Sequence, residues 1–180
     1  YDVLTIGNAI VDIIARTEDD FLRANGIIKG AMNLIDGERA ELLYARMGPA
    51  VEASGGSAGN TAAGVASLGG RSAYFGKVSN DHLGAIYTHD IRAQGVAFDT
   101  WPLQGLPPTA RSMIFVTPDG ERSMNTYLGA CVELKPEYIE EDKFAGSQIT
   151  YFEGYLWDPP LAKDAIRLAS KIAHANGRKM

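Results

Sequence analysis

The feature that most constrains the fold is a glycine-rich turn that leads into a helix built from small side chains. Residues 54–60 read Ser-Gly-Gly-Ser-Ala-Gly-Asn, and residues 61–68 are rich in Ala and Gly before Gly69-Gly70 ends the segment. A helix of such small residues packs very close to a sheet, and glycines permit tight turns between strands and helices. The pattern therefore predicts an α/β protein, and the high count of 20 glycines agrees with it.

Short apolar strands alternate with helical patterns toward both ends of the chain. The strand patterns cover 3–6, 72–78 and 148–156, and the clearest helical patterns cover 82–94 and 159–175. Strands that alternate with helices in this way form parallel sheets with helices on their faces. We therefore expect a parallel, doubly wound sheet as the main body of the fold.

A second group of strands does not follow this alternation. These strands are predicted near 9–16, 31–35, 97–103 and 110–128, and the last of them is a hairpin that turns at Pro118-Asp119-Gly120. We expect the four segments to form a small second sheet beside the main one.

Composition and charge narrow the class of protein. The chain has 180 residues, of which 46% are hydrophobic, and this is enough to bury one good core. The net charge is −5 and no run of Lys and Arg forms a stripe, so we expect no nucleic-acid partner. No stretch approaches the roughly 18–20 apolar residues that span a bilayer, so we expect no membrane partner.

The cysteine and histidine content argues against disulfides and metal sites. Cys131 is the only cysteine, so it has no internal partner, which fits a cytoplasmic protein. His82, His89 and His174 are scattered without a partner cysteine, so we expect no metal site. Because the chain does not begin with Met and ends just after a helix-ending Asn-Gly pair, it is either a small complete domain or a piece of a larger one.

The glycine-rich turn is the first candidate for chemistry. Backbone N–H groups at a helix start bind anions or oxygens, and glycines let a ligand approach the backbone. The spacing of a dinucleotide fingerprint is missing, and Gly59 is followed by Asn60 and Thr61 rather than by the Lys-Ser/Thr of a P-loop. A classical dehydrogenase and a P-loop ATPase are therefore disfavoured, while a plain tight turn stays an alternative.

Three polar residues outside the glycines are further candidates. Asp12 is a lone carboxylate in the apolar segment 9–15; it either meets the hydroxyls of a ligand or faces water on an edge strand. Asn60 lies about one turn inside a helix, where its amide suits a polyol or is simply a polar residue at a helix start. Arg122 follows the hairpin turn and either reaches an anionic group or lies on the solvated surface.

Taken together, these segments are similar to a known family signature in order and spacing. The matching segments are Gly7–Asp12, Gly55–Ala62 with Leu68-Gly69, Gly76–Gly84, Thr117–Arg122 and Tyr127–Ala130. In these segments the chain resembles the PfkB (ribokinase-like) family of carbohydrate kinases, and in particular its adenosine kinase-like branch. The likeness extends over essentially all 180 residues.

The resemblance implies a fold and an activity. The implied fold is ribokinase-like: a Rossmann-like three-layer α/β/α sheet with a small β-sheet lid. The implied activity is transfer of the γ-phosphoryl group of ATP, with Mg²⁺, to the hydroxymethyl group of a nucleoside or sugar. Adenosine is the leading substrate, and fructose or another sugar is the alternative. A non-catalytic module that binds a polyol or nucleoside is the alternative from another class.

The resemblance also implies roles for individual residues. Asp12 would hold substrate hydroxyls from the lid side, and Gly55, Gly56 and Asn60 would hold them from the main domain. Asn8 would lie near the ribose and Arg122 near the transferred phosphate. The positions implied to line an apolar base pocket are Met124, Leu128 and Leu156.

Two motifs of the family are missing. The catalytic Asp of a Gly-Ala-Gly-Asp turn does not occur, and no Asn is followed by Glu three residues later. Both motifs belong to the C-terminal half of the family, which also holds the ATP site. We therefore expect residues 1–180 to be the N-terminal, substrate-binding and lid part of such a kinase, with the catalytic base beyond Met180. Pairing of two copies through the lid is a further expectation from the family.

Overall fold

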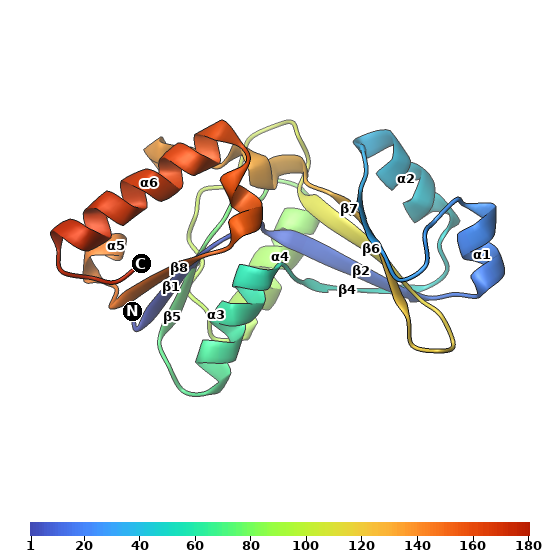
Figure 1. Ribbon diagram of the computed structural model, residues 1–180, viewed down its shortest axis with the longest axis horizontal. Helices are drawn as coiled ribbons and strands as arrows, with labels where there is room; N and C mark the ends of the chain where they lie inside the picture. Colours follow the sequence, from blue (N-terminus) through green and yellow to red (C-terminus); the bar gives the residue numbers. More distant parts are fainter.

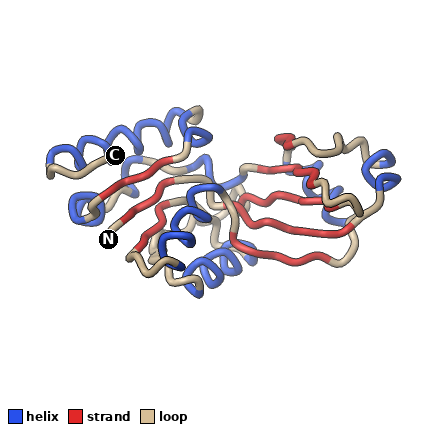
Figure 2. The backbone as a smooth tube through the Cα atoms, turned by 60° about the horizontal axis from the view of Figure 1, so that its bottom comes forward, coloured by secondary structure: helices blue, strands red, loops and turns tan.

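Two separate sheets form the framework of the protein. The computed structural model describes residues 1–180, and Figures 1 and 2 show a smaller sheet near the two termini and a larger one at the other end of the molecule. The strands are β1 Val3–Ile6, β2 Ile10–Arg16, β3 Met32–Leu34, β4 Ala50–Ser54, β5 Ser72–Phe75, β6 Ala110–Val116, β7 Arg122–Tyr127 and β8 Ile149–Phe152. The α-helices are α1 Asp19–Ala24, α2 Gly37–Arg46, α3 Ser57–Ser67, α4 His82–Ala93, α5 Glu141–Gly146 and α6 Pro160–Ala175. Short 3₁₀ turns are η1 Gly129–Glu133, η2 Pro136–Tyr138 and η3 Gly154–Trp157.

The main sheet is parallel and covered on both faces. Its strand order is β5-β1-β8, and Val3 pairs with Ser72 on one side and with Ile149 on the other. Helices α5 and α6 lie over one face and α3 and α4 over the other (Figure 1). The three-layer arrangement predicted from the alternation of strands and helices is confirmed.

The helices meet the sheet through small and aromatic side chains. The buried face of α6 repeats every three or four residues, as an amphipathic helix requires; its members are Ala162, Ala165, Ile166, Ala169 and Ala173. On the other face, Ala58 and Ala62 of α3 are fully buried and let that helix lie close to β1. The small-residue helix therefore packs as its composition predicts.

The second sheet, here called the lid sheet, is mixed and covered on one face. Its strand order is β3-β7-β6-β2-β4, with β6 and β7 as an antiparallel hairpin. Met113 and Phe115 of β6 point toward α1 and α2 and form a core with Leu22 and Leu43. Strands near 9–16, 31–35 and 110–128 are thus present in this sheet as predicted.

Two parts of the lid prediction differ from the structure. Residues 97–103 are not a lid strand but a loop along the edge of the main sheet, with single parallel bridges from Ala97 to Ala73 and from Leu103 to Ser79. The segment looks like a strand because Phe98 and Trp101 are aromatic and Thr100 is β-branched, yet Pro102 has no N–H to donate to a ladder. The missing lid strand is β4, a short edge strand that pairs with β2.

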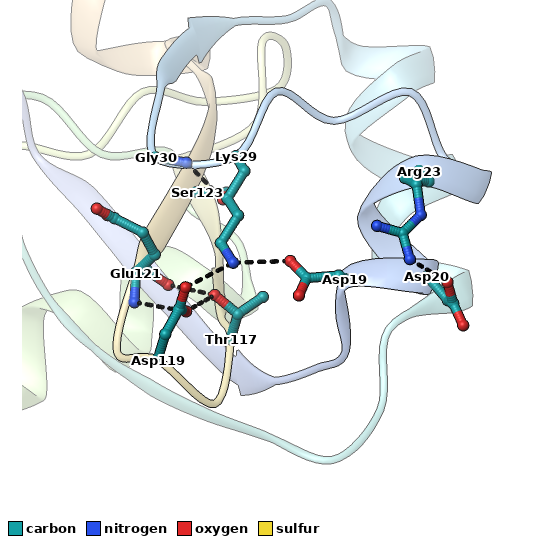
Figure 3. A network of polar contacts seen from close by, with 9 residues as sticks. All are labelled: Asp19, Asp20, Arg23, Lys29, Gly30, Thr117, Asp119, Glu121 and Ser123. Carbon is teal, nitrogen blue, oxygen red and sulfur yellow. Dashed lines mark hydrogen bonds and ion pairs between the residues drawn. The ribbon is translucent and has the colours of Figure 1, made fainter.

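The tip of the β6–β7 hairpin is joined to the segment after α1 (Figure 3). The ammonium of Lys29 lies 2.8 Å from Asp19 Oδ1 and 2.7 Å from Asp119 Oδ2. These bonds raise the pKa of Lys29 and lower that of Asp119. The hydroxyl of Ser123 also accepts the Gly30 N–H at 3.0 Å, so this segment runs along β7 before it becomes β3.

The chain passes between the two sheets next to its glycines. Residues 7–9 lead from β1 to β2, and Gly55-Gly56 lead from β4 to α3. The Gly55 N–H donates to the Ile10 carbonyl at 2.8 Å, so the two crossings touch. The candidate residues of the sequence therefore gather at the junction of the sheets. No helix in the structure combines the length and apolarity needed to cross a membrane.

Candidate functional site at the junction of the sheets

Asp12 lies against the glycine-rich turn. It is the third residue of β2 and is half-buried, and a Cβ added to Gly55 would lie 2.5 Å from its Oδ2. Only glycine leaves room for the carboxylate at this position. The structure therefore brings Asp12 and Gly55 together, as the sequence motifs predict.

Gly56 allows the backbone of Asn8 to lie close to the glycine-rich turn. Its φ of +84° lies in the left-handed region, and an added Cβ would come within 2.2 Å of the Asn8 carbonyl oxygen. The Oδ1 atom of Asn8 is buried and has no hydrogen-bond partner in the protein. A ligand at the junction is a natural source of the missing donor.

Asn60 is the fourth residue of α3, about one turn inside the helix as the sequence predicts. Its N–H donates to the Gly56 carbonyl at 2.9 Å, and the residue is exposed. The helix begins at Ser57, where a buried carboxylate accepts hydrogen bonds from Ser57 and Ala58. Asn60 is therefore held at a fixed distance from the glycine turn with its amide free to contact solvent or a ligand.

That buried carboxylate belongs to Glu153, a residue that the sequence reasoning missed. Its Oε1 accepts the Asn8 N–H at 2.5 Å, and its Oε2 accepts the Ala58 N–H at 2.9 Å and the Ser57 hydroxyl. Glu153 is only 4% exposed, at the end of β8. A negative charge at a helix start is favourable, so Glu153 fixes the start of α3 and the end of β1 together. The signal in the sequence is a Glu at the end of an apolar strand pattern.

Asp12 is electrostatically unlike Glu153. Burial raises the pKa of the Asp12 carboxyl, and the positive charge of Arg122 lowers it to a smaller extent. No hydrogen bond contributes to the shift. Asp12 is thus a desolvated acceptor without a protein donor, and ligand hydroxyls would supply the donors that it lacks.

The open face of the lid sheet carries several of the predicted residues. Asp12 pairs with Ser112, and Ser112 pairs with Thr126, so these three side chains share one face. Met124 and Arg122 lie on the same face of β7, two and four residues before Thr126. Arg122 is exposed and Met124 is half-buried. The structure therefore places Arg122 and Met124 on the same face of the lid as Asp12.

The two remaining apolar candidates differ from each other. Leu128 is half-buried just after β7, and its carbonyl accepts the Cys131 N–H at 3.1 Å. Leu156 is fully buried among Leu4, Phe144 and the alanines of α6, so the prediction that it lines a base pocket is wrong. The turn η3 points Leu156 into the core of the main domain and leaves Tyr155 72% exposed instead.

A separate hollow of about 870 Å³ lies between α4 and residues 98–102. It contains none of the predicted site residues and is lined in part by Asn80, Thr88, Arg92 and Trp101. The chain holds no group of three or more His, Cys, Asp or Glu side chains that could bind a metal ion. The junction of the sheets is therefore the place where acceptors, amides and accessible backbone come together.

The sequence match and the fold identify the class of protein. Residues 2–180 match the pfkB family of carbohydrate kinases, so the chain belongs to this family. The crystal structure of adenosine kinase from Sinorhizobium meliloti is 80% identical, with a TM-score of 0.91 over 99% of this chain and 54% of that one. A probable sugar kinase from Rhizobium etli CFN 42 is 71% identical, with a TM-score of 0.93 over 100% of this chain and 55% of that one.

A more distant relative acts on other nucleosides. The guanosine-inosine kinase of Escherichia coli (strain K12) is 29% identical over 161 residues, which are 86% of this chain and 37% of that protein. The chain thus spans about half the length of the two solved structures and less of this enzyme.

Proposed function

We propose that this protein is an ATP-dependent kinase that phosphorylates the hydroxymethyl group of a nucleoside, with adenosine as its substrate. The observation that carries the proposal is the Asp12 carboxylate, which is desolvated against Gly55 and lacks a protein donor; the Asn8 amide oxygen, in the crossing that leads into β2, also lacks a partner. Membership of the pfkB family and the similarity to an adenosine kinase support it.

In this proposal the sugar ring of the substrate lies between the lid sheet and the start of α3. Asp12 accepts hydrogen bonds from two ring hydroxyls on the lid side. The amides of Asn8 and Asn60 and the backbone at Gly56 contact the same ring from the main domain. A carboxylate that accepts from a pair of hydroxyls binds more strongly than a neutral acceptor, so Asp12 sets affinity and orientation rather than proton transfer.

The phosphate side of the proposal rests on Arg122. Arg122 lies on the same face of the lid sheet as Asp12, and its positive charge lowers the pKa of the Asp12 carboxyl. In this proposal its guanidinium contacts the transferred phosphoryl group. ATP would supply the phosphoryl group, and Mg²⁺ would neutralise charge on its phosphates. Closure of the lid sheet over the ring would exclude water from the reaction.

The test uses the full-length protein with ATP and Mg²⁺ and measures phosphorylated product with adenosine, guanosine, inosine and fructose. We expect adenosine to be phosphorylated with the highest kcat/KM and to raise the Tm. The variant Asp12→Ala should lose most of this shift, while Asp20→Ala, at an exposed site of α1, should keep it. Absence of phosphoryl transfer to every compound would contradict the proposal.

A sugar kinase is the second candidate. The likeness to the probable sugar kinase from Rhizobium etli CFN 42 favours it. The apolar candidates Met124 and Leu128 offer no polar side-chain group that would distinguish a nucleoside from a sugar. A higher kcat/KM for fructose than for adenosine in the same assay would select this candidate.

Pairing through the lid is also part of the proposal. Met32 and Leu34 of the edge strand β3, three strands away from β2 with Asp12, are 52% and 62% exposed, and a second copy packed on that edge would cover them. Light scattering of the full-length protein tests this: a mass of two chains is expected, and Leu34→Glu should halve it. A single-chain mass for the unchanged protein would refute pairing.

A further inference from the structure

Two connections of the chain support the lid hairpin. The incoming connection, residues 97–109, leads into β6, and the outgoing connection, residues 128–138, leaves β7. Both pass the loop of residues 76–81, which follows β5 at the carboxyl end of the main sheet. In open α/β sheets this end is where ligands bind, so the loop is close to the chemistry without carrying any of the site residues described above.

Lys77 in this loop contacts both connections. Its ammonium donates to the Trp101 carbonyl of the incoming connection and lies 3.4 Å from the ring centroid of Tyr138 on the outgoing one. The residue is only 1% exposed, and no carboxylate pairs with it. Lysine is almost never this buried unless it is paired, so the position has a cost that the two contacts must offset.

The same loop holds the incoming connection at further points. The Ser79 hydroxyl donates to the Gly105 carbonyl at 2.9 Å. Asp81 accepts the Thr109 N–H at 2.8 Å and the Thr109 hydroxyl at 2.7 Å, directly before β6 begins. The two connections also touch each other, because the Ala130 N–H donates to the Pro108 carbonyl at 2.8 Å. Lys77 is the member of this network that reaches both connections with one atom.

We propose that Lys77 is a positioning residue for the lid: its ammonium holds the incoming and outgoing connections of the β6–β7 hairpin against the main sheet and so sets how Arg122 is placed over the substrate. This inference rests on the proposed kinase function. Lys77 itself touches neither substrate nor phosphate in this assignment, and it acts through the hairpin alone.

The charge of Lys77 is the sensitive part of this arrangement. Burial lowers its pKa to about 8, the positive charge of Lys135 acts in the same direction and Glu137 opposes it. The other groups that face it are the Trp101 carbonyl and the Tyr138 ring, and Asp81 in its own loop is already bonded to Thr109. Loss of the proton weakens the contact with the aromatic face, so the placement of the hairpin should loosen above this pH.

The first experiment compares Lys77→Met, Lys77→Arg and, as a control, Lys171→Met on an exposed turn of α6 in the full-length protein. We expect Lys77→Met to raise the KM for the nucleoside about tenfold with a smaller change in kcat and to remove the inflection near pH 8 from the pH profile of kcat/KM. Lys77→Arg should restore part of the KM, and the control should match the unchanged protein. An unchanged KM and an unchanged inflection in Lys77→Met would overturn the inference.

The second experiment uses the unchanged protein and does not depend on its enzymatic activity. Hydrogen exchange of the backbone amides in residues 101–109 and 130–138 is measured at pH 7 and pH 9 and corrected for intrinsic rates. We expect both segments to lose protection together at pH 9, while α6 does not. Loss in neither segment, or in one alone, would overturn the inference. A protein that shows this loss but phosphorylates nothing would refute the proposed kinase function and leave the contact itself established.

Discussion

The main sheet and the lid sheet differ in how much of their surface is covered by helices. All four residues of β5 in the main sheet are buried, and helices cover both faces. In the lid sheet one face packs on α1 and α2, and every residue of the edge strands β3 and β4 is exposed or half-buried. The main sheet is a scaffold whose strand ends define positions, and the lid sheet offers a surface on which a ligand can lie.

The two carboxylates at the junction of the sheets differ in their hydrogen-bond donors. Glu153, on the main-sheet side, accepts hydrogen bonds from Asn8, Ser57 and Ala58. Asp12, on the lid side, accepts none and is desolvated against Gly55. The Glu153 carboxylate finds its hydrogen-bond donors within the fold, whereas the Asp12 carboxylate has none from the protein and is the proposed ligand acceptor. The difference teaches that burial alone does not reveal the role of a carboxylate. The hydrogen-bond donors around it do.

The largest effect is expected from removing the satisfied carboxylate. Glu153→Ala leaves two buried N–H groups and a hydroxyl without an acceptor, and we expect unfolding free energy to fall by roughly 3–5 kcal/mol. Urea denaturation of the full-length protein measures this, with Glu141→Ala, at an exposed site of α5, as the control. A loss no larger than that of the control would show that Glu153 does not hold the start of α3.

Asp12→Asn should affect binding and stability in opposite directions. Loss of charge-assisted hydrogen bonds should raise the KM about 10- to 150-fold, the equivalent of about 1.5–3 kcal/mol. Burial raises the folded-state pKa of Asp12 above its usual 3.8, so the folded protein binds more protons between these two values and loses stability as pH rises through them. An uncharged Asn avoids this loss.

The stability arm of that prediction is measured as a difference in Tm between Asp12→Asn and the unchanged protein. We expect the variant to be the more stable at pH 7 and the difference to shrink as pH falls toward 3.8. Asp20→Asn serves as the exposed control. If Asp12→Asn were less stable at pH 7, the carboxylate would have a protein partner after all.

Gly55→Ala tests the contact between the turn and the lid. The new methyl group would lie 2.5 Å from Asp12 Oδ2, and we expect a stability loss of about 1–3 kcal/mol together with a smaller rise in KM than Asp12→Asn gives. Gly48→Ala, which meets nothing within 4 Å, is the control. In an Asp12→Ala background most of the loss should disappear, and a loss that persists would mean that the methyl group clashes elsewhere.

The smallest effect is expected at the tip of the hairpin. Lys29→Met removes the ammonium that joins Asp19 to Asp119, at a site largely open to water (Figure 3). Salt screens such pairs, so a small decrease in Tm at low ionic strength should vanish at about 1 M salt. A decrease that is independent of salt would assign the role to the packing of the lysine stem instead.

The parts of the fold that the sequence predicted are those with strong local signals. The alternation of strands and helices, the glycine turn and the 110–128 hairpin each depend on neighbouring residues, and each is present. The family motifs also led us to expect Asp12, Gly55 and Gly56 together, and the structure brings them to one junction, while their role in a site stays a prediction. Their distances and the missing donor of Asp12 could come only from the structure.

The parts that the sequence could not predict depend on distant partners. Residues 97–103 have the composition of a strand but meet the edge of the main sheet at single bridges, while β4 has weak strand character but finds β2 as a partner. Leu156 lies one residue from an exposed tyrosine, so its direction depends on a single 3₁₀ turn. Glu153 acts through residues about 95 and 145 positions away along the chain.

The lid sheet is assembled from two separate excursions of the chain, 10–54 and 110–127, which meet where β2 and β6 pair along seven residues. Neither excursion forms the sheet without the other. A lid cannot therefore be inherited or exchanged between relatives as one contiguous cassette, because a hybrid with one foreign excursion would have to match the β2–β6 register and side-chain faces of its host. Changes in the substrate preference of this architecture should accordingly arise by coordinated replacement of the two segments, or by single substitutions on their shared open face.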